Sequence, residues 1–422
     1  MIRERSNLSN ILSVFIAVWV VLGVLRWSTS ITDKGPVFDE QYIIVPINNL
    51  IEKGWTVETA IDFQETKGPA MIWPYAFFGK LFGGTLNDLR LVSVWCSVLS
   101  ATILAWIGLR CFSLSRKELV LVTIGWLLLP YNIVFSEIVM GESSFLLLSL
   151  LAVAVFVWGV EEDPPTSRRF IAPLLYCVVV AVALHSRIHV VALTGGICFT
   201  AFALQGKQSW PWWAASIIAG LLRIPLWLRW DGLVSPEYQS LHGLGFRLES
   251  LSYLAAAMVP FVGVFAIEGW RIAKSKSLIL WSFYFGVLLV FVATPDLTIP
   301  EDIDFENPNE RFQGIVATFS LAFAPISKYV LAFLAGIGLA GLAGLWHCKN
   351  KVALVTSITF WSLMFGWLLY AVTRGFVFDR FLLTWAFLLP IVWIRTLPKW
   401  LLIPQFAALT LIAVWLTVGW LC

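Results

Sequence analysis

The amino-acid sequence predicts an all-α, polytopic integral membrane protein with about thirteen transmembrane helices. Of its 422 residues, 59% are hydrophobic and only 13% are charged, whereas soluble domains carry about 25% charged residues. Apolar runs of about 20 residues, the length of helix that crosses a bilayer core, recur along the chain. Aromatic residues make up 15% of the chain and include 23 Trp, which fits aromatic belts at the two membrane interfaces.

The apolar runs define thirteen predicted spans. They cover residues 10–28, 90–112, 118–136, 143–160, 170–186, 188–206, 210–230, 251–270, 277–294, 325–346, 352–373, 380–394 and 400–421. The basic start MIRERSNLSN precedes the first run, as in a signal peptide. No A-x-A-like cleavage site follows it, so an uncleaved first helix is expected.

The apolar segment 68–83 decides the topology. It contains Pro69, Pro74 and Lys80, and either a short span or an interfacial helix would accommodate it. If it lies on the outer surface, nearly every Lys and Arg cluster falls on the inner side, as the positive-inside rule requires. We therefore expect an interfacial helix, with the N-terminus inside and the C-terminus outside.

Residues 1–422 are expected to form a single membrane-embedded domain without an internal repeat. The two longest outer loops are the amphipathic first loop, about 28–89, and the acidic stretch 295–324, which is either a solvated loop or a lid over an outward-facing site.

The net charge of +3 is too small to indicate a nucleic-acid partner. The six Cys show no CxxC spacing, which argues against a disulfide framework or a zinc site.

Charged residues close to the membrane are candidates for function, because they are costly there. Asp39 and Glu40 follow an apolar pair and open an amphipathic stretch. They are either acids at a helix start, where the dipole favours them, or a general base or metal ligand. Arg90 stands at the predicted outer end of the second span. Most other basic residues lie on the inner side, so a basic residue at this position indicates that Arg90 has a fixed partner. Arg223 lies inside a predicted span and needs a partner or a phosphate.

Further charged residues fall at the predicted outer ends of other spans. They are Glu65, Lys67, Glu137, Glu142, Arg187, Arg374 and Arg380. Carboxylates suit the deprotonation of an acceptor hydroxyl or amine, or the binding of a divalent cation. Guanidinium and ammonium groups suit a phosphate. Together these groups predict chemistry with a phosphate leaving group at the outer membrane face.

An ordered series of motifs resembles a known group of enzymes. FDEQY follows the first span, GW comes about a dozen residues later, KGP opens the next apolar helix, LFGG ends it and LR starts the following span. SEIVMGES and FDRFLLTWAFLLP come later. The series resembles the GT-C glycosyltransferases, which include the protein O-mannosyltransferases and the aminoarabinose transferases that modify lipid A. The chain departs from many relatives in having KGP in place of a double proline, and, unlike in the oligosaccharyltransferases, no large soluble C-terminal domain is expected to follow.

The resemblance implies a polyprenyl-phosphate-linked sugar donor among the membrane lipids and an inverting transfer to a lipid, glycan or protein acceptor. The reaction would take place at the outer face of a bacterial plasma membrane. Asp39, with Glu40, would be the catalytic carboxylate. Lys67 and Arg90 would bind the donor phosphate or fix the loop.

The same resemblance assigns further phosphate contacts to Arg187, Arg374 and Arg380. The second acid, for the acceptor or a metal, would come from Glu65, Glu137 and Glu142. A divalent metal ion is left open, and no other cofactor is implied. The main alternative is a transporter or flippase of a lipid-linked or anionic solute, which predicts paired repeats and broken helices near mid-bilayer. A non-catalytic scaffold is a third reading.

Overall fold

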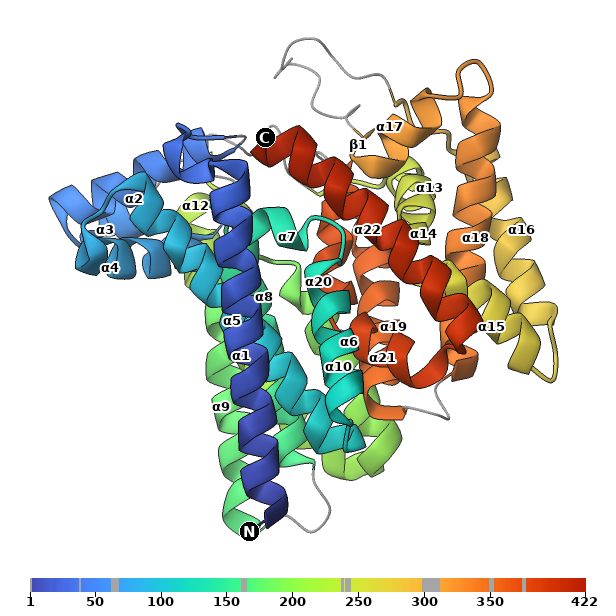
Figure 1. Cartoon of the computed structure of the whole chain (residues 1–422), viewed down its shortest axis with the longest axis horizontal. Helices are drawn as coiled ribbons and strands as arrows, with labels where there is room; N and C mark the ends of the chain where they lie inside the picture. Colours follow the sequence, from blue (N-terminus) through green and yellow to red (C-terminus); the bar gives the residue numbers. More distant parts are fainter. Residues whose placement is uncertain are drawn as a thin grey trace. The chain divides into compact units, whose positions relative to one another are not determined.

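The structure, a computed structural model, is almost entirely helical (Figure 1). It describes residues 2–37, 39–61, 68–160, 165–236, 239, 244–297, 312–348, 353–373 and 377–422. Within these ranges the only strands are β1 (Phe312–Gln313) and β2 (Val377–Phe378), a parallel pair of two residues each. The predicted fold class, an all-α polytopic membrane protein, is confirmed.

The chain divides into two compact units. Unit 1 comprises Met1–Glu237 with Ala413–Cys422, and unit 2 comprises Tyr238–Ile412. The helices of unit 1 are α1 (Ile2–Thr29), η1 (Ile31–Asp33), α2 (Glu40–Lys53), α3 (Val57–Ala60), η2 (Pro69–Met71), α4 (Trp73–Phe82), α5 (Leu86–Phe112), α6 (Arg116–Leu127), α7 (Asn132–Phe135), α8 (Glu142–Gly159), α9 (Thr166–Ser186), α10 (Val190–Gln205), η3 (Gly206–Ser209), α11 (Trp210–Leu221) and α12 (Ile224–Trp230).

Unit 2 contains the remaining helices, and the last of them is shared with unit 1. They are α13 (Leu248–Ala257), α14 (Val259–Val262), α15 (Val264–Ile272), α16 (Ser277–Val292), α17 (Ile315–Leu321), α18 (Ser327–His347), α19 (Ala353–Leu369), η7 (Asp379–Leu382), α20 (Leu383–Ala386), α21 (Leu389–Thr396) and α22 (Lys399–Leu421). The expectation of a single domain over 1–422 stays a prediction.

Seven helices among the described residues are long and apolar enough to cross a membrane. They are Leu8–Thr29, Leu86–Phe112, Glu142–Gly159, Ser167–Ser186, Val190–Trp230, Ser327–His347 and Lys399–Leu421. An eighth span is formed if Leu248–Val262 and Val264–Ile272, which are bent by 74° at their junction, count as one. The predicted count of thirteen is therefore not confirmed.

The difference in count arises where apolar sequence is broken into shorter helices. α6 has 12 residues, α16 has 16 and α19 has 17. The predicted spans 188–206 and 210–230 fall in one apolar run, in which α10, η3, α11 and α12 follow each other. Hydropathy counts apolar residues but does not register a break in the backbone, so the number of predicted spans and the number of helices of spanning length differ.

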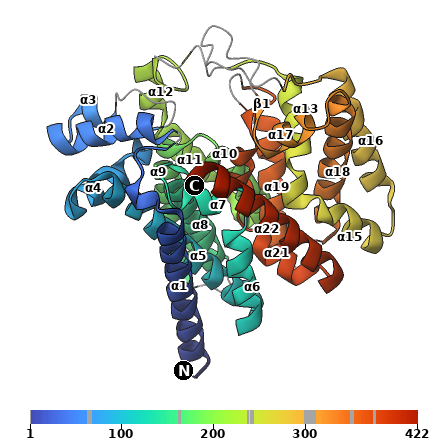
Figure 2. The same cartoon turned by 45° about the horizontal axis from the view of Figure 1, so that its top comes forward.

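The segment 68–83 forms η2 and the ten-residue helix α4. At 1.5 Å per residue, ten residues extend about 15 Å, roughly half of a bilayer core. α4 is thus too short to span, in agreement with the predicted interfacial helix. α2, α3 and α4 lie together at the end of α1 that is remote from the N-terminus (Figures 1 and 2).

In unit 2, α18 packs against α13, α14, α15 and α16. Gly338, Gly341 and Gly344 lie three residues apart along it, and we call them the glycine face of α18. A Cβ atom on these residues would collide with the carbonyl oxygens of Ala255, Val262 and Phe265 respectively. Small residues therefore let the backbones of α18 and the α13–α15 segment touch, as is common between membrane helices. Figure 2 shows α13, α16 and α18 side by side.

Candidate active site

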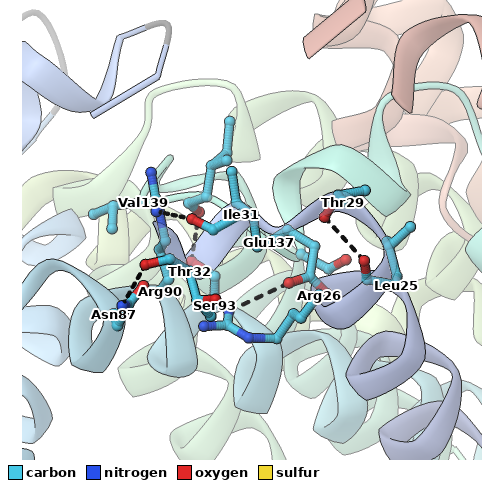
Figure 3. A network of polar contacts seen from close by, with 12 residues as sticks. Leu25, Arg26, Thr29, Ile31, Thr32, Asn87, Arg90, Ser93, Glu137 and Val139 are labelled. Carbon is cyan, nitrogen blue, oxygen red and sulfur yellow. Dashed lines mark hydrogen bonds and ion pairs between the residues drawn. The ribbon is translucent and has the colours of Figure 1, made fainter. Parts of the chain in front are cut away.

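Arg90, near the start of α5, holds the loop that follows α1. Its buried guanidinium donates two hydrogen bonds to the Glu40 carboxylate, from Nε to Oε1 at 3.0 Å and from Nη2 to Oε2 at 2.6 Å. The other three go to the carbonyl oxygens of Ile31 (2.5 Å), Lys34 (3.0 Å) and Gly35 (2.8 Å). Figure 3 shows Arg90 against Ile31. We call these five residues the Arg90 clamp. All five N–H donors of the guanidinium are thus used.

Glu40, the first residue of α2, is fully buried and joins three segments of unit 1. Besides the two bonds from Arg90, its carboxylate accepts the backbone N–H groups of Val37 (2.8 Å) and Val139 (2.7 Å). A buried charge needs such pairing, because an unpaired carboxylate in a low-dielectric interior is costly. The Glu40 carboxylate therefore links the loop after α1, the start of α5 and the segment between α7 and α8.

Asp39 directly precedes Glu40 and occupies the N-cap position of α2. Its backbone is helical, with φ −71° and ψ −5°, and its half-buried side chain makes no capping hydrogen bond to α2. The side chain therefore does not cap α2 through a hydrogen bond, and the two roles, an acid at a helix start or a general base or metal ligand, stay predictions. The Arg90 clamp fixes the backbone on both sides of this acid, through Gly35 before it and Glu40 after it.

Glu137 lies between α7 and α8 and forms an ion pair with Arg26 from the last turn of α1. The distance from Arg26 Nη1 to Glu137 Oε2 is 3.3 Å, and the carboxylate is fully buried (Figure 3). Burial raises the pKa of the Glu137 carboxyl to about 8, although the charges of Arg26 and Arg90 act to lower it. Arg26 was not singled out by sequence reasoning. The signal that could have identified Arg26 is its position as a basic residue at the end of an apolar run.

Glu142, the first residue of α8, pairs with Arg187 at the end of α9. Arg187 Nη2 lies 2.6 Å from Glu142 Oε1, and both side chains are buried. Glu142 Oε2, Glu137 Oε1 and Arg187 Nε are buried and have no hydrogen-bond partner among the described residues. Each of these two ion pairs thus keeps a polar atom available for a ligand.

The start of η2 docks on the turn that contains Arg187. The N–H of Gly68 donates to the carbonyl oxygen of Ser186 at 2.8 Å, and a Cβ on Gly68 would collide with the carbonyl oxygen of His185. Gly141, just before Glu142, packs against the side chain of Met71 with similar closeness. Segments 68–71, 141–142 and 185–187 are therefore held together.

The predicted site residues have different outcomes. Asp39, Glu40, Arg90, Glu137, Glu142 and Arg187 all lie in unit 1, where the contacts above connect them. Glu65, Lys67 and Arg374 lie outside the described residues, as do residues 298–311 of the predicted lid, the loop 295–324. Arg380 belongs to unit 2, where its guanidinium stacks 4.3 Å from the ring centroid of Phe378. Among the described residues, no three His, Cys, Asp or Glu side chains come together as a metal site.

The contacts of Arg90 and Glu40 bear on the roles expected for them from the sequence. The predicted fixed partner of Arg90 is confirmed, and it is Glu40. Of the two roles left open for Arg90, phosphate binding or fixing the loop, the geometry favours the second, because its five donors already have acceptors. The carboxylate of Glu40 is likewise occupied by four hydrogen bonds, which favours a positioning role.

Comparison with known proteins finds no matching family model and no matching curated protein. Two solved structures are similar, both of ArnT from Cupriavidus metallidurans. The apo form has 12% identity and a TM-score of 0.46, covering 94% of this chain and 76% of that one. The form bound to undecaprenyl phosphate has 14% identity and a TM-score of 0.44, covering 96% and 77%. Values this low do not transfer an activity, so the function is argued from the residues.

Proposed function

We propose that this protein is a membrane glycosyltransferase. It moves a sugar from a polyprenyl-phosphate donor to a lipid, glycan or protein acceptor at the outer face of the membrane. The observation that carries the proposal is the placement of Asp39. Its half-buried carboxylate does not cap α2, and the fully bonded Arg90 clamp fixes the backbone around it. Such preorganisation is what a general base requires.

In the proposed reaction, Asp39 accepts the proton of the acceptor hydroxyl or amine. The acceptor atom attacks the anomeric carbon while the bond from that carbon to the phosphate oxygen breaks. The lipid phosphate leaves with the electron pair. This is a single displacement with inversion, so no sugar is bound covalently to the enzyme. Glu40 and Arg90 position Asp39 and do not touch the reacting atoms.

The leaving phosphate needs cationic groups in a water-poor environment. We assign this role to Lys67, Arg187, Arg374 and Arg380, as the sequence motifs imply. Among them, the described contacts support Arg187, which keeps a buried Nε without a partner while Glu142 holds its other end. The unpartnered oxygens of Glu137 and Glu142 are the atoms we assign to a second acid or to a divalent cation.

The test is the substitution Asp39→Asn, which keeps the size of the side chain and removes its basicity. Membranes of cells that express wild type or variant are compared by mass spectrometry of their glycolipid, glycan and glycoprotein fractions. We expect a product that carries an added sugar mass to depend on wild type and to be absent with the variant, at equal membrane abundance of the protein. The matched control is Asp33→Asn, an exposed acid in η1, which should retain the product. Equal product from Asp39→Asn would refute the assignment.

One observation favours the alternative of a transporter or flippase. The α13–α15 segment is bent by 74° between Leu248–Val262 and Val264–Ile272, and broken helices are a feature of transporters. This reading predicts that purified protein in liposomes moves a polyprenyl-phosphate sugar between leaflets, and that Asp39→Asn does so equally well. Sugar transfer without movement of the donor would exclude it.

A further inference from the structure

Arg223 differs from the other buried arginines of unit 1. It lies between α11 and α12, inside the apolar run Val190–Trp230, and is only 2% exposed. Arg26, Arg90 and Arg187 each pair with a carboxylate. The guanidinium of Arg223 has no such partner among the described residues, and its Nε and Nη1 have no hydrogen-bond acceptor there.

Among the described residues, the immediate surroundings of Arg223 add another donor and no anion. Its guanidinium carbon lies 5.8 Å from the ring centroid of Trp227. The indole Nε1 of Trp227 is also buried without an acceptor in the described part of the chain. Leaving several N–H donors unsatisfied in a buried position is costly, and the cost is larger for a cation. As far as the described residues show, the site therefore lacks an acceptor, and an anion would complete it.

The residues around Arg223 indicate whether such an anion comes from water or from lipid. Leu221, Leu222, Ile224 and Leu228 are large apolar residues on the same two helices, and between 38% and 77% of their surface is exposed. In a membrane protein, surfaces of this kind face lipid. A free anion in water does not reach a cation beneath such a surface, whereas an anion attached to a lipid tail does.

We propose that Arg223, with Trp227 beside it, binds the phosphate group of a lipid. The planar fork of guanidinium N–H groups matches two phosphate oxygens, and the Trp227 N–H can donate to a third. Arg223 also interacts electrostatically with His185, two residues before Arg187. Arg223 therefore lies near the turn to which Gly68 and Glu142 are bonded.

Two lipids carry this chemistry, a polyprenyl phosphate and a membrane phospholipid. The existence of the site does not depend on sugar transfer. Only its assignment to the polyprenyl-phosphate donor rests on the proposed function. In that case Arg223 supplies a phosphate contact that lies outside the motifs that resemble the GT-C glycosyltransferases, and phosphate is the choice among the two partners expected from the sequence.

The experiment measures binding by the purified full chain in a neutral detergent, using native mass spectrometry. The probes are undecaprenyl phosphate, the uncharged alcohol undecaprenol, and phosphatidylglycerol. We expect wild type to bind a phosphate-bearing probe at least about tenfold more tightly than undecaprenol, which corresponds to one charge-assisted contact. Preference for undecaprenyl phosphate assigns the donor, and preference for phosphatidylglycerol assigns a structural phospholipid.

Two variants make the outcome specific. Arg223→Gln should lose the preference for the phosphate-bearing probe, whereas Arg229→Gln, an exposed arginine on the same helix, should keep it. Asp39→Asn should also keep it, so failure of the catalytic assignment leaves this result intact. Equal affinity of wild type and Arg223→Gln for both phosphate lipids would overturn the proposal.

Thermal unfolding gives an independent measurement. Because the buried charge has no partner in the described part of the chain, Arg223→Met should unfold at a higher temperature than wild type in detergent without added lipid. Addition of the bound phosphate lipid should raise the unfolding temperature of wild type and leave that of Arg223→Met unchanged. A lower unfolding temperature of the variant under both conditions would point to a purely structural arginine and also contradict the proposal.

Discussion

The Arg90 clamp in unit 1 and the glycine face of α18 in unit 2 hold their segments by opposite means. In the clamp, a buried guanidinium satisfies two carboxylate oxygens and three backbone carbonyls. In the glycine face, the absence of side chains lets backbones touch. The first region thus depends on keeping charges paired, whereas the second depends on volume alone. Different substitutions should therefore break each region.

The largest effect is expected from Arg90→Met. This change leaves the Glu40 carboxylate buried without its cation and three carbonyl groups without a donor. Loss of one partner of a buried ion pair costs about 3–5 kcal/mol of unfolding free energy. We expect a large drop in the thermal unfolding temperature of the purified protein in detergent, together with loss of any sugar transfer that depends on Asp39.

The double variant Glu40→Gln with Arg90→Met tests whether charge pairing is the cause. A glutamine in place of Glu40 would still accept the N–H of Val139 through its amide oxygen, and it carries no charge. The double variant should therefore be more stable than Arg90→Met alone. If it were less stable, the size of the Arg90 side chain, and not its charge, would be what the clamp requires.

An intermediate effect is expected from Gly338→Ala. The added methyl group would meet the carbonyl oxygen of Ala255 on α13, and neither backbone can retract easily. Overpacking of this kind costs about 1–3 kcal/mol, measured again by thermal unfolding. Gly220→Ala is the control, since nothing lies within 4 Å of a Cβ at that position. A destabilised control would show that methyl groups are tolerated poorly for reasons other than close helix contact.

The smallest effect, a dependence on pH, is expected at Glu137. The folded state binds a proton at Glu137 below a pKa of about 8, whereas a Glu in the unfolded chain does so only near its ordinary value of 4.5. Between these values the folded state holds more protons, so its stability falls as pH rises, by about 1.4 kcal/mol per unit. Above pH 8 this dependence ends.

Glu137→Gln should remove that dependence. The quantity to compare is the difference in unfolding temperature between wild type and variant at about pH 6.5 and about pH 8.5, on either side of the folded-state pKa. Wild type should gain stability relative to Glu137→Gln at the lower pH. A constant difference would mean that the ion pair with Arg26 keeps Glu137 charged over the whole range.

The sequence predicts the helical character of the chain because composition and hydropathy depend only on which residues are present. The positive-inside pattern predicts that 68–83 does not span the membrane, and the ten-residue length of α4 agrees with this. The sequence also indicates that Arg90 has a fixed partner, because Arg90 is a basic residue on the predicted outer side, where few others lie. In each of these cases the signal is local in the chain.

The partners themselves could not be predicted in this way. Glu40 lies 50 residues from Arg90, Glu142 lies 45 from Arg187, and Arg26 lies 111 from Glu137. Which acid meets which base depends on how α1, α5, α8 and α9 pack, and hydropathy carries no information on that. The predicted count of thirteen spans is likewise not confirmed, since hydropathy does not show where an apolar run is divided into shorter helices, as it is around η3 between α10 and α11.

The Arg90 clamp also limits how the loop between α1 and α2 can change. Surface loops usually tolerate insertions, because added length costs little entropy. Here the carbonyls of Ile31, Lys34 and Gly35 must all reach one guanidinium, and Glu40 must reach it from the other side. The loop consequently has no spare length. One inserted residue between Ile31 and Glu40 would force a choice between the carbonyl contacts and the carboxylate contact, and would move Asp39 in either case.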